Sequence, residues 1–123
     1  MNESRVEFQG YSVSSLEMEK VLDNKKKKES SFEIKSNFFQ NVSDKLSYKL
    51  VMNLVVISEK HKINMTLEGF FKFNSRLDDE MIEQFFNVNA RMILYPYCRT
   101  IISSITSFDS PNSVLLPIIN FQE

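Results

Sequence analysis

The sequence predicts an α+β fold: a four-stranded antiparallel sheet with a bent C-terminal helix pair packed on one side. Three observations support this. Apolar and polar residues alternate through much of residues 5–73, the spacing then becomes helical, and all three prolines lie between positions 96 and 117. Strands that precede helices, rather than alternating with them, are typical of α+β proteins. At 123 residues, the chain is expected to form one domain spanning 1–123.

The first expected strand, residues 5–18, changes phase in its middle. Its apolar residues fall on one face up to Phe8 and on the opposite face from Tyr11, with Gly10 at the change. A glycine where the two-residue period slips by one is the pattern of a β-bulge. We therefore predict a bulged strand.

Residues 19–31 break this alternation and are expected to form a polar, Lys-rich crossover loop. Lys25 to Lys28 are a block of like charge, which is typical of a solvated loop. The alternative, a patch for nucleic acid or an anionic membrane, normally has a larger basic footprint. With a net charge of −1, we expect no nucleic-acid partner.

Three more strands are expected at 32–40, 46–57 and 63–73. The longest alternation runs from Leu46 to Val56, and a polar break at 58–62 separates it from the last strand. Two alternating segments joined by a short polar break predict an antiparallel hairpin. His61 lies in that break and is expected to be a turn residue.

A helix is expected to begin near Asp78. This residue can act as the N-cap, and Asp79 and Glu80 suit the positive end of a helix. The alternative reading, paired carboxylates for acid–base chemistry or Ca²⁺, is disfavoured because consecutive helical positions do not converge. Pro96 is expected to interrupt or restart the helix, since it cannot donate to the helical ladder.

Beyond Pro96, Tyr97, Ile101, Ile105 and Phe108 repeat at helical spacing. Residues 109–112 are expected to end this helix. The last stretch, 114–121, is apolar but contains a proline, so we expect it to pack in an extended form outside the sheet.

Cysteine usage and the lack of targeting signals point to the cytoplasm. A single cysteine, Cys98, excludes an internal disulfide and fits a reducing compartment. We expect no signal peptide and no membrane insertion, because no apolar run has the required length or flanks. Cys98 is expected to be a buried packing residue, with a thiol of lowered pKa as the alternative. Cys98 and His61 cannot complete a four-ligand zinc site, and nothing resembles a P-loop, so we expect no metal and no cofactor.

Large apolar side chains are abundant for so small a chain, with 11 Phe and 6 Met. Most are expected to form the core. A domain of this size has a high ratio of surface to volume, so the excess favours an oligomer or a surface that binds apolar partners.

Two motifs in the C-terminal third resemble those of the SecB family, tetrameric chaperones that hold unfolded preproteins for export. Residues 89–99 read N-A-R-M-I-L-Y-P-Y-C-R and residues 115–121 read L-L-P-I-I-N-F. They are similar to the family's Asn-x-Leu-Phe/Tyr-Pro-Tyr-x-Arg element at the start of its long helix and to its closing Leu-x-Pro-x-Asn-Phe element. The glycine and aromatics at 69–71 match the end of its fourth strand, and the resemblance covers residues 5–121.

The chain departs from the family pattern in three respects. The sequence stops at Glu123, so we expect it to lack the C-terminal helix that helps SecB proteins engage the translocase motor. The crossover carries lysines where the family has Trp and Pro, and the polar face of the expected sheet is not acidic. SecB-like proteins also serve as chaperones of antitoxins in toxin–antitoxin systems, and these departures suit that role.

The resemblance implies that unfolded clients bind in apolar grooves between the sheet and the helices. It also implies where those grooves lie along the chain. The client-binding residues expected on the matched segments are Phe32, Ile34, Phe38, Leu94, Tyr97, Ile101 and Phe108. Arg99 is expected to tie the helix to a carboxylate or to the backbone carbonyls of Tyr95, Pro96 and Tyr97.

We therefore expect an ATP-independent holdase, not an enzyme, that forms a homo-oligomer arranged as a dimer of dimers. Its expected partners are unfolded or precursor polypeptides or an antitoxin, with the translocase motor as a further partner to be tested. A small-ligand-binding α+β domain is the alternative from another class. It would need convergent polar groups in a pocket, and the sequence offers no cluster of His, Cys or carboxylates. A structural subunit of an oligomer is the third alternative.

Overall fold

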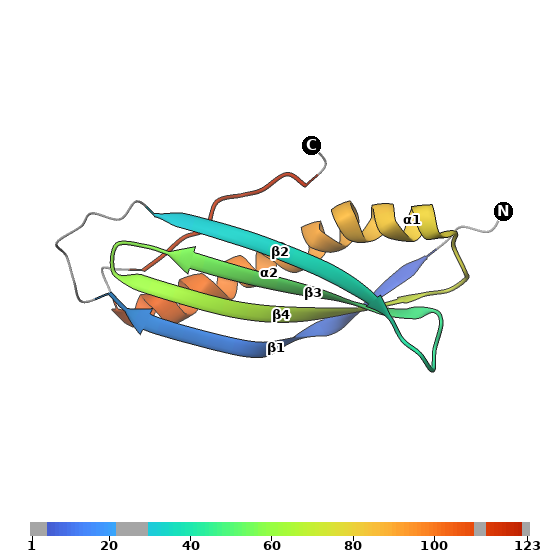
Figure 1. Ribbon diagram of the computed structural model, residues 1–123, viewed down its shortest axis with the longest axis horizontal. Coiled ribbons are helices and arrows are strands. Elements are labelled where there is room, and N and C mark those ends of the chain that lie inside the picture. The colour runs from blue at the N-terminus through green and yellow to red at the C-terminus, as the bar shows by residue number, and fades with distance from the viewer. Residues whose placement is uncertain (1–4, 22–29, 110–112, 122–123) are drawn as a thin grey trace.

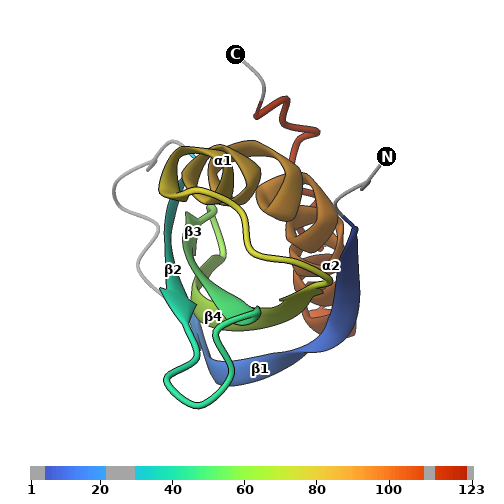
Figure 2. The ribbon, with the colours of Figure 1, turned by 90° about the vertical axis from the view of Figure 1, so that its right-hand side faces the viewer.

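The computed structural model describes residues 5–21, 30–109 and 113–121. Four strands come first: β1 (Val6–Lys20), β2 (Ser31–Gln40), β3 (Ser47–Ile57) and β4 (His61–Phe73). They form one antiparallel sheet in the order β1-β4-β3-β2, which makes β1 and β2 its edges. Helices cover one face of this sheet, here called the inner face (Figures 1 and 2). The expected α+β fold is therefore confirmed.

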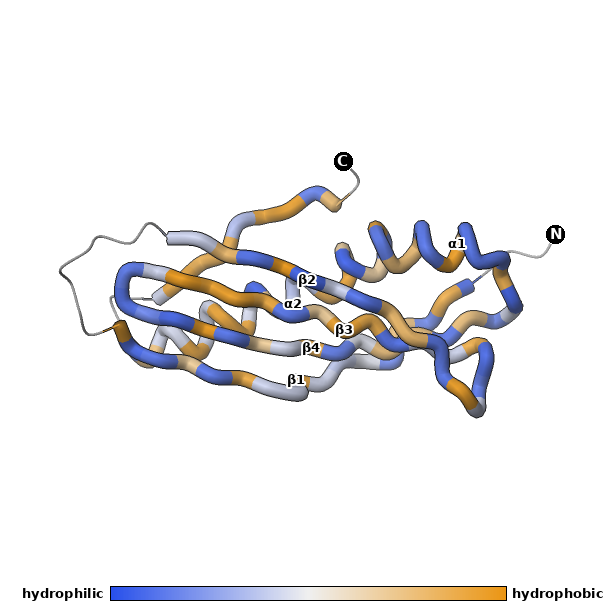
Figure 3. Tube along the Cα trace, in the orientation of Figure 1, coloured by the Kyte–Doolittle hydropathy of each residue, from blue (hydrophilic) through white to orange (hydrophobic). Residues whose placement is uncertain are grey.

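The core forms where the central strands meet the helix. Directly opposed residues of an antiparallel pair point to the same face, and on the inner face Met52 pairs with Leu67 and Leu54 with Met65. All four side chains are fully buried. Figure 3 shows the apolar and polar residues alternating along the strands and a continuously apolar end of β3.

β1 contains the bulge that Gly10 predicts. Its register against β4 shifts between Phe8 and Tyr11, and Gly10 has a φ of 108°. A second shift occurs between Val13 and Ser15, without a glycine to signal it. The expected loop at 19–31 is too long, because β1 continues to Lys20 and β2 begins at Ser31. The lysine block at 25–28 lies outside the described residues.

The helical part is one continuous segment rather than a pair. It consists of α1 (Asp79–Gln84), the π-helical turn η1 (Phe85–Asn89), α2 (Ala90–Thr106) and the 3₁₀ turn η2 (Ser107–Asp109). Asp78 caps its start as expected, since its carboxylate accepts a hydrogen bond of 2.8 Å from the Met81 N–H.

The expected break at Pro96 is wrong, because α2 runs straight through this residue. Proline removes one helical hydrogen bond, but the same turn buries Leu94, Tyr95 and Cys98 against the rest of the protein. This tertiary packing outweighs the local preference. The irregular turn lies earlier, in η1, where the Ala90 N–H reaches back to the Phe85 carbonyl.

Candidate functional site

The C-terminal segment, residues 113–121, is extended and is held to α2 by side chains of that helix. The Tyr95 hydroxyl donates to the Pro117 carbonyl at 2.6 Å, and the Arg99 Nε–H donates to the Leu116 carbonyl at 3.1 Å. The Val114 N–H donates to Thr106 Oγ1 at 2.7 Å. Arg99 therefore ties the helix to a backbone carbonyl, but this carbonyl belongs to Leu116 and not to the expected residues 95–97.

Aromatic contacts fix the far end of this segment. The Phe121 ring meets the Tyr95 ring edge-on, with centroids 5.7 Å apart, and the Arg91 guanidinium lies 5.4 Å from the Phe121 centroid. Leu116 is buried in the core. Burial raises the pKa of the Tyr95 hydroxyl, so this hydroxyl remains a hydrogen-bond donor at neutral pH. The two sequence motifs are thus parts of one contact.

A groove of about 380 Å³ opens between this segment and the sheet. We call it the β2 groove. One wall is the start of β2 at Ser30 to Phe32, another is the β3–β4 hairpin from Val56 to Lys60, and the third is Ser113 to Pro117. Leu115 is 75% exposed on the third wall. The groove therefore combines accessible apolar side chains with backbone from three separate elements.

The expected site residues on β2 lie on the inner face beside this groove. Phe32 lines the groove, and Ile34 and Phe38 follow it in the same phase, all three half-buried. Phe38 stacks on Phe86 of η1, with centroids 4.7 Å apart. Of the three residues, only Phe32 lines the groove, whereas the ring of Phe38 packs against the helical segment.

The expected residues on α2 do not join this groove. Leu94 is fully buried and sits over Gly69, where a Cβ would lie 3.0 Å from its Cδ1. Leu94 is therefore a core residue that a client cannot reach in this conformation. Phe108 is 88% exposed in η2. Ile101 is half-buried one helical turn beyond Tyr97.

Tyr97 belongs to a second apolar surface at the other edge of the sheet. Its ring packs against Tyr11 of β1 at 4.5 Å and against Phe8 at 5.7 Å between centroids. Four β1 side chains continue this surface on the inner face, each between 40% and 43% exposed. This β1 strip consists of Tyr11, Val13, Leu16 and Met18.

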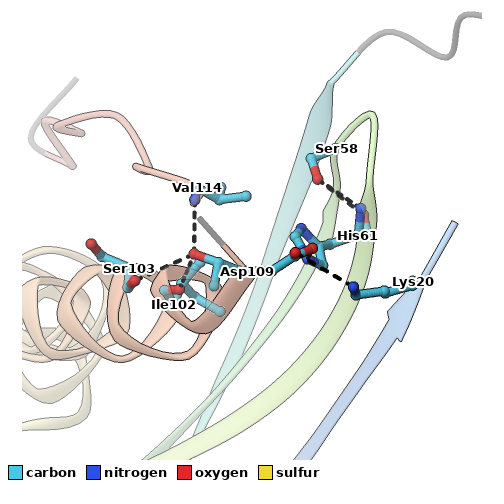
Figure 4. Close-up of polar contacts among 8 residues, drawn as sticks. Lys20, Ser58, His61, Ile102, Ser103, Asp109 and Val114 are labelled. Carbon is cyan, nitrogen blue, oxygen red and sulfur yellow. Dashed lines mark hydrogen bonds and ion pairs between the residues drawn. The ribbon is translucent and has the colours of Figure 1, made fainter. Parts of the chain in front are cut away.

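A polar cluster joins the ends of β1, β4 and η2 (Figure 4). His61, the first residue of β4, is fully buried, and its Nε2 lies 2.9 Å from Asp109 Oδ2. Lys20, at the end of β1, lies 3.4 Å from the other oxygen of Asp109. The expectation that His61 is a turn residue is wrong. Within the described residues Nδ1 has no hydrogen-bond partner, and the Nε2 contact has the distance but not the alignment of a hydrogen bond.

Cys98 is a packing residue, as expected. Its side chain is fully buried beside the Met52 sulfur, 3.8 Å away. Burial raises the pKa of the Cys98 thiol to about 12, so it stays protonated at neutral pH. Such a thiol is a poor nucleophile.

Two parts of these surfaces are not signalled by the sequence. The groove wall at 113–117 reads only as an extended apolar tail, and nothing in the strand pattern shows that the β1 strip is left half uncovered. The one available signal is the run of apolar residues from Leu115 to Ile118. An extended segment cannot bury every side chain, so some of these apolar residues must be exposed.

The described residues contain no cluster of three or more His, Cys, Asp or Glu side chains that could hold a metal ion. None of the helices in the described part of the chain is long and apolar enough to cross a membrane.

The fold and the site define a small α+β protein with one helical segment on a four-stranded sheet and apolar surfaces at both sheet edges. The family model for SecB, the preprotein translocase subunit, matches residues 9–123. The chain therefore belongs to the SecB family, as its two motifs predicted.

Solved structures share this fold. A SecB-like chaperone of Mycobacterium tuberculosis, in complex with a ChAD peptide from the HigA1 antitoxin, matches with a TM-score of 0.77 at 11% identity. The match covers 94% of this chain and 88% of that one. A Streptococcus agalactiae protein of unknown function matches with a TM-score of 0.68 at 15% identity, over 95% of this chain and 100% of that one. No curated protein matches the chain in sequence.

Proposed function

We propose that this protein is an ATP-independent chaperone that holds unfolded polypeptides, with the β2 groove as the client-binding site. The observation that carries the proposal is the groove itself. It is open, it has half-buried Phe32 and exposed Leu115 on two of its walls, and it belongs to a SecB family member. A holding chaperone needs accessible apolar surface that accepts many sequences, and it needs no reacting group.

The groove is small, so each groove gives only part of the affinity. Burial of apolar surface contributes about 25 cal/mol per Å² before the cost of ordering the client. A client must therefore bury about 1,000 Å² or more for stable binding. Several linked grooves raise the effective concentration of client segments, which favours an oligomer.

The β1 strip is the surface that we propose for assembly of a homo-oligomer, arranged as a dimer of dimers in the cytoplasm. Its four apolar side chains lie along an edge strand and extend the packing of Tyr97. A second copy that covers them would remove this apolar surface from water.

An antitoxin is the second candidate for the client. The M. tuberculosis protein of similar fold was solved with an antitoxin peptide. The outer face of the sheet also carries balanced charge: Lys49 pairs with Glu68 at 3.2 Å, and Lys72 pairs with Asp44 of the β2–β3 turn at 3.2 Å. The strand registers place five glutamates and four lysines on this face. This excess is too small to attract a basic partner strongly, so binding to the translocase motor is the less supported of the two roles.

Light scattering of a reduced, unfolded protein during its aggregation tests the proposal. The chain should suppress scattering at about one oligomer per client and without nucleotide, because burial alone holds the client. No suppression at an excess of the chain over the client would contradict it. An inert protein at the same mass concentration controls for crowding.

A further inference from the structure

His61 is fully buried, yet its ring lacks the hydrogen-bond partners that buried polar side chains normally have. Among the described residues, neither ring nitrogen makes an aligned hydrogen bond. Nε2 faces Asp109 Oδ2 at 2.9 Å, so Nε2 carries a hydrogen, since two lone pairs at this distance would repel each other. An apolar ring of similar size would avoid the cost of the unpaired nitrogen. The contact with Asp109 is therefore what distinguishes His61 from an ordinary core residue.

His61 is fixed to the hairpin wall of the β2 groove. The Ser58 N–H donates to the His61 carbonyl at 2.8 Å, and the His61 N–H donates to Ser58 Oγ at 3.0 Å. Ser58, Glu59 and Lys60 all line the groove. The imidazole therefore projects from a hydrogen-bonded turn that is itself part of the groove (Figure 4).

Asp109 belongs to the helical segment that carries the third wall of the groove. It ends η2, which continues directly from α2. Thr106, the last residue of α2, is fully buried, and its Oγ1 accepts the Val114 N–H at 2.7 Å. Val114 lies in the third wall. A contact that holds η2 in place therefore also fixes the end of the helix from which this wall is held.

The two walls are attached to different parts of the fold. The hairpin belongs to the sheet, whereas Tyr95, Arg99 and Thr106 hold the third wall to the helix. In the described part of the chain, no hydrogen bond or ion pair runs directly from one of these walls to the other. The contact between His61 and Asp109 joins the two parts at the end of the groove.

We propose that His61 is a positioning residue for client binding, and that its contact with Asp109 is a latch that sets how far the third wall stands from the hairpin wall. This inference rests on the proposed function, and it gives His61 a role without contact to the client. Loss of the latch should free η2 and the last turn of α2, so that fewer molecules have a groove of the right width. A client binds only the molecules in the competent conformation, so its apparent affinity falls with their fraction.

Lys20 contributes less to the latch than His61 does. Its ammonium lies 3.4 Å from Asp109 Oδ1, but its side chain is 61% exposed. Exposed ion pairs contribute little, because water screens the charges. The buried ring of His61 is shielded from water, so its contact with the carboxylate is the stronger of the two.

Residue-resolved amide hydrogen exchange and client binding, measured on the same variants, test the latch. His61→Phe keeps an aromatic ring but removes the contact, and Asp109→Asn removes the carboxylate charge with little change in shape. In both variants the Val114 amide should exchange about tenfold faster or more, because its acceptor on Thr106 is no longer held in place. Amides in the middle of β3 and β4 should keep their exchange rates, which shows that the variants are folded.

The client in the binding measurement is a permanently unfolded protein. Its dissociation constant should rise about threefold in either variant, which corresponds to a competent groove in about one third of the molecules. The double variant should bind no more weakly than the weaker single variant, because both changes break the same contact. Asp44→Asn is the matched control. It removes a carboxylate charge from the pair with Lys72, in the β2–β3 turn at the other end of β3, and should change neither measurement.

Three results would overturn the latch. Unchanged exchange of the Val114 amide in both variants would show that His61 only fills space in the core. Faster exchange with unchanged client affinity would show that the contact does not act on client binding. Additive losses in the double variant would show that the two residues act separately. Absence of client binding by the wild type would refute the proposed function and the role of His61 in it, whereas the exchange rates would still decide whether His61 holds the third wall.

Discussion

The Tyr95 hydroxyl donates a hydrogen bond of 2.6 Å to the carbonyl oxygen of Pro117, twenty-two residues along the chain. This contact explains why the two motifs occur together. Tyr95 and Arg99 of the first motif hold the backbone of Leu116 and Pro117 in the second, and the Tyr95 ring packs on Phe121. The pair of motifs therefore builds one wall of the β2 groove.

Replacing Tyr95 with Phe should loosen this wall without unfolding the domain. The variant Tyr95→Phe loses one part-buried hydrogen bond, so the free energy of unfolding should fall by about 1 kcal/mol in a urea titration. Exchange of the amides in 113–121 should accelerate more than exchange in β3. Tyr97→Phe is the matched control, because no hydrogen bond of the Tyr97 hydroxyl is seen among the described residues. Equal effects of the two variants would refute the role of Tyr95.

Alkaline pH should destabilise the protein through Cys98. Burial raises the folded-state pKa of this thiol from 9.0 to about 12. Its contribution to stability is therefore complete below pH 9 and is lost as the pH rises toward 12, because the unfolded chain gives up the proton first. Between these limits the wild type should lose about 1.4 kcal/mol per pH unit more than Cys98→Ala does. Urea titrations at several pH values measure the difference, and parallel curves for the two proteins would contradict it.

Gly69 should not tolerate a side chain. A Cβ at this position would lie 3.0 Å and 3.2 Å from the two Cδ atoms of Leu94 and 3.3 Å from the Phe71 ring. Since Leu94 is fully buried and cannot swing away, Gly69→Ala should cost about 1–3 kcal/mol of unfolding free energy. The double variant with Leu94→Ala should cost less than the sum of the two single changes. If the cost of the double variant equals the sum of the two single costs, the added methyl group does not clash with Leu94 and the prediction is wrong.

Charges on the β1 strip should disrupt assembly. The double change Val13→Lys and Leu16→Lys places two cations on side chains that are 40% and 41% exposed, so a partner surface would have to bury them at high cost. Light scattering coupled to size exclusion should give a mass above 14.4 kDa for the wild type and a lower mass for the variant. Val42→Lys, at an 88% exposed position in the β2–β3 turn, is the control. A monomeric wild type would contradict the proposed oligomer.

Most of the fold could be predicted because its signals are local. The alternation in β3 and β4, the glycine at the first bulge of β1 and the Asp78 cap each act within a few residues. The predicted break at Pro96 is wrong because that prediction also considers local effects alone. The cost of the proline is local, whereas the burial of Leu94, Tyr95 and Cys98 that offsets it depends on tertiary packing.

The candidate site was less predictable, because exposure depends on which elements meet. Phe32 and Leu94 are both apolar residues in matched segments, yet one lines a groove and the other lies in the core. His61 appears as a polar residue in a polar break, and only η2, which brings Asp109 to 2.9 Å from its Nε2, explains its burial.

The central claim is that the β2 groove holds unfolded polypeptide, and its most direct test is a comparison of two variants of the C-terminal segment. Leu115→Ser changes a 75% exposed residue that lines the groove, and Ile118→Ser changes an 84% exposed residue that lies outside it. Neither should destabilise the domain. Calorimetric titration with a permanently unfolded protein should show binding about tenfold weaker for Leu115→Ser, the loss of roughly one well-buried leucine contact. Ile118→Ser should bind like the wild type. Equal affinities for all three proteins, or no binding by the wild type, would contradict the account.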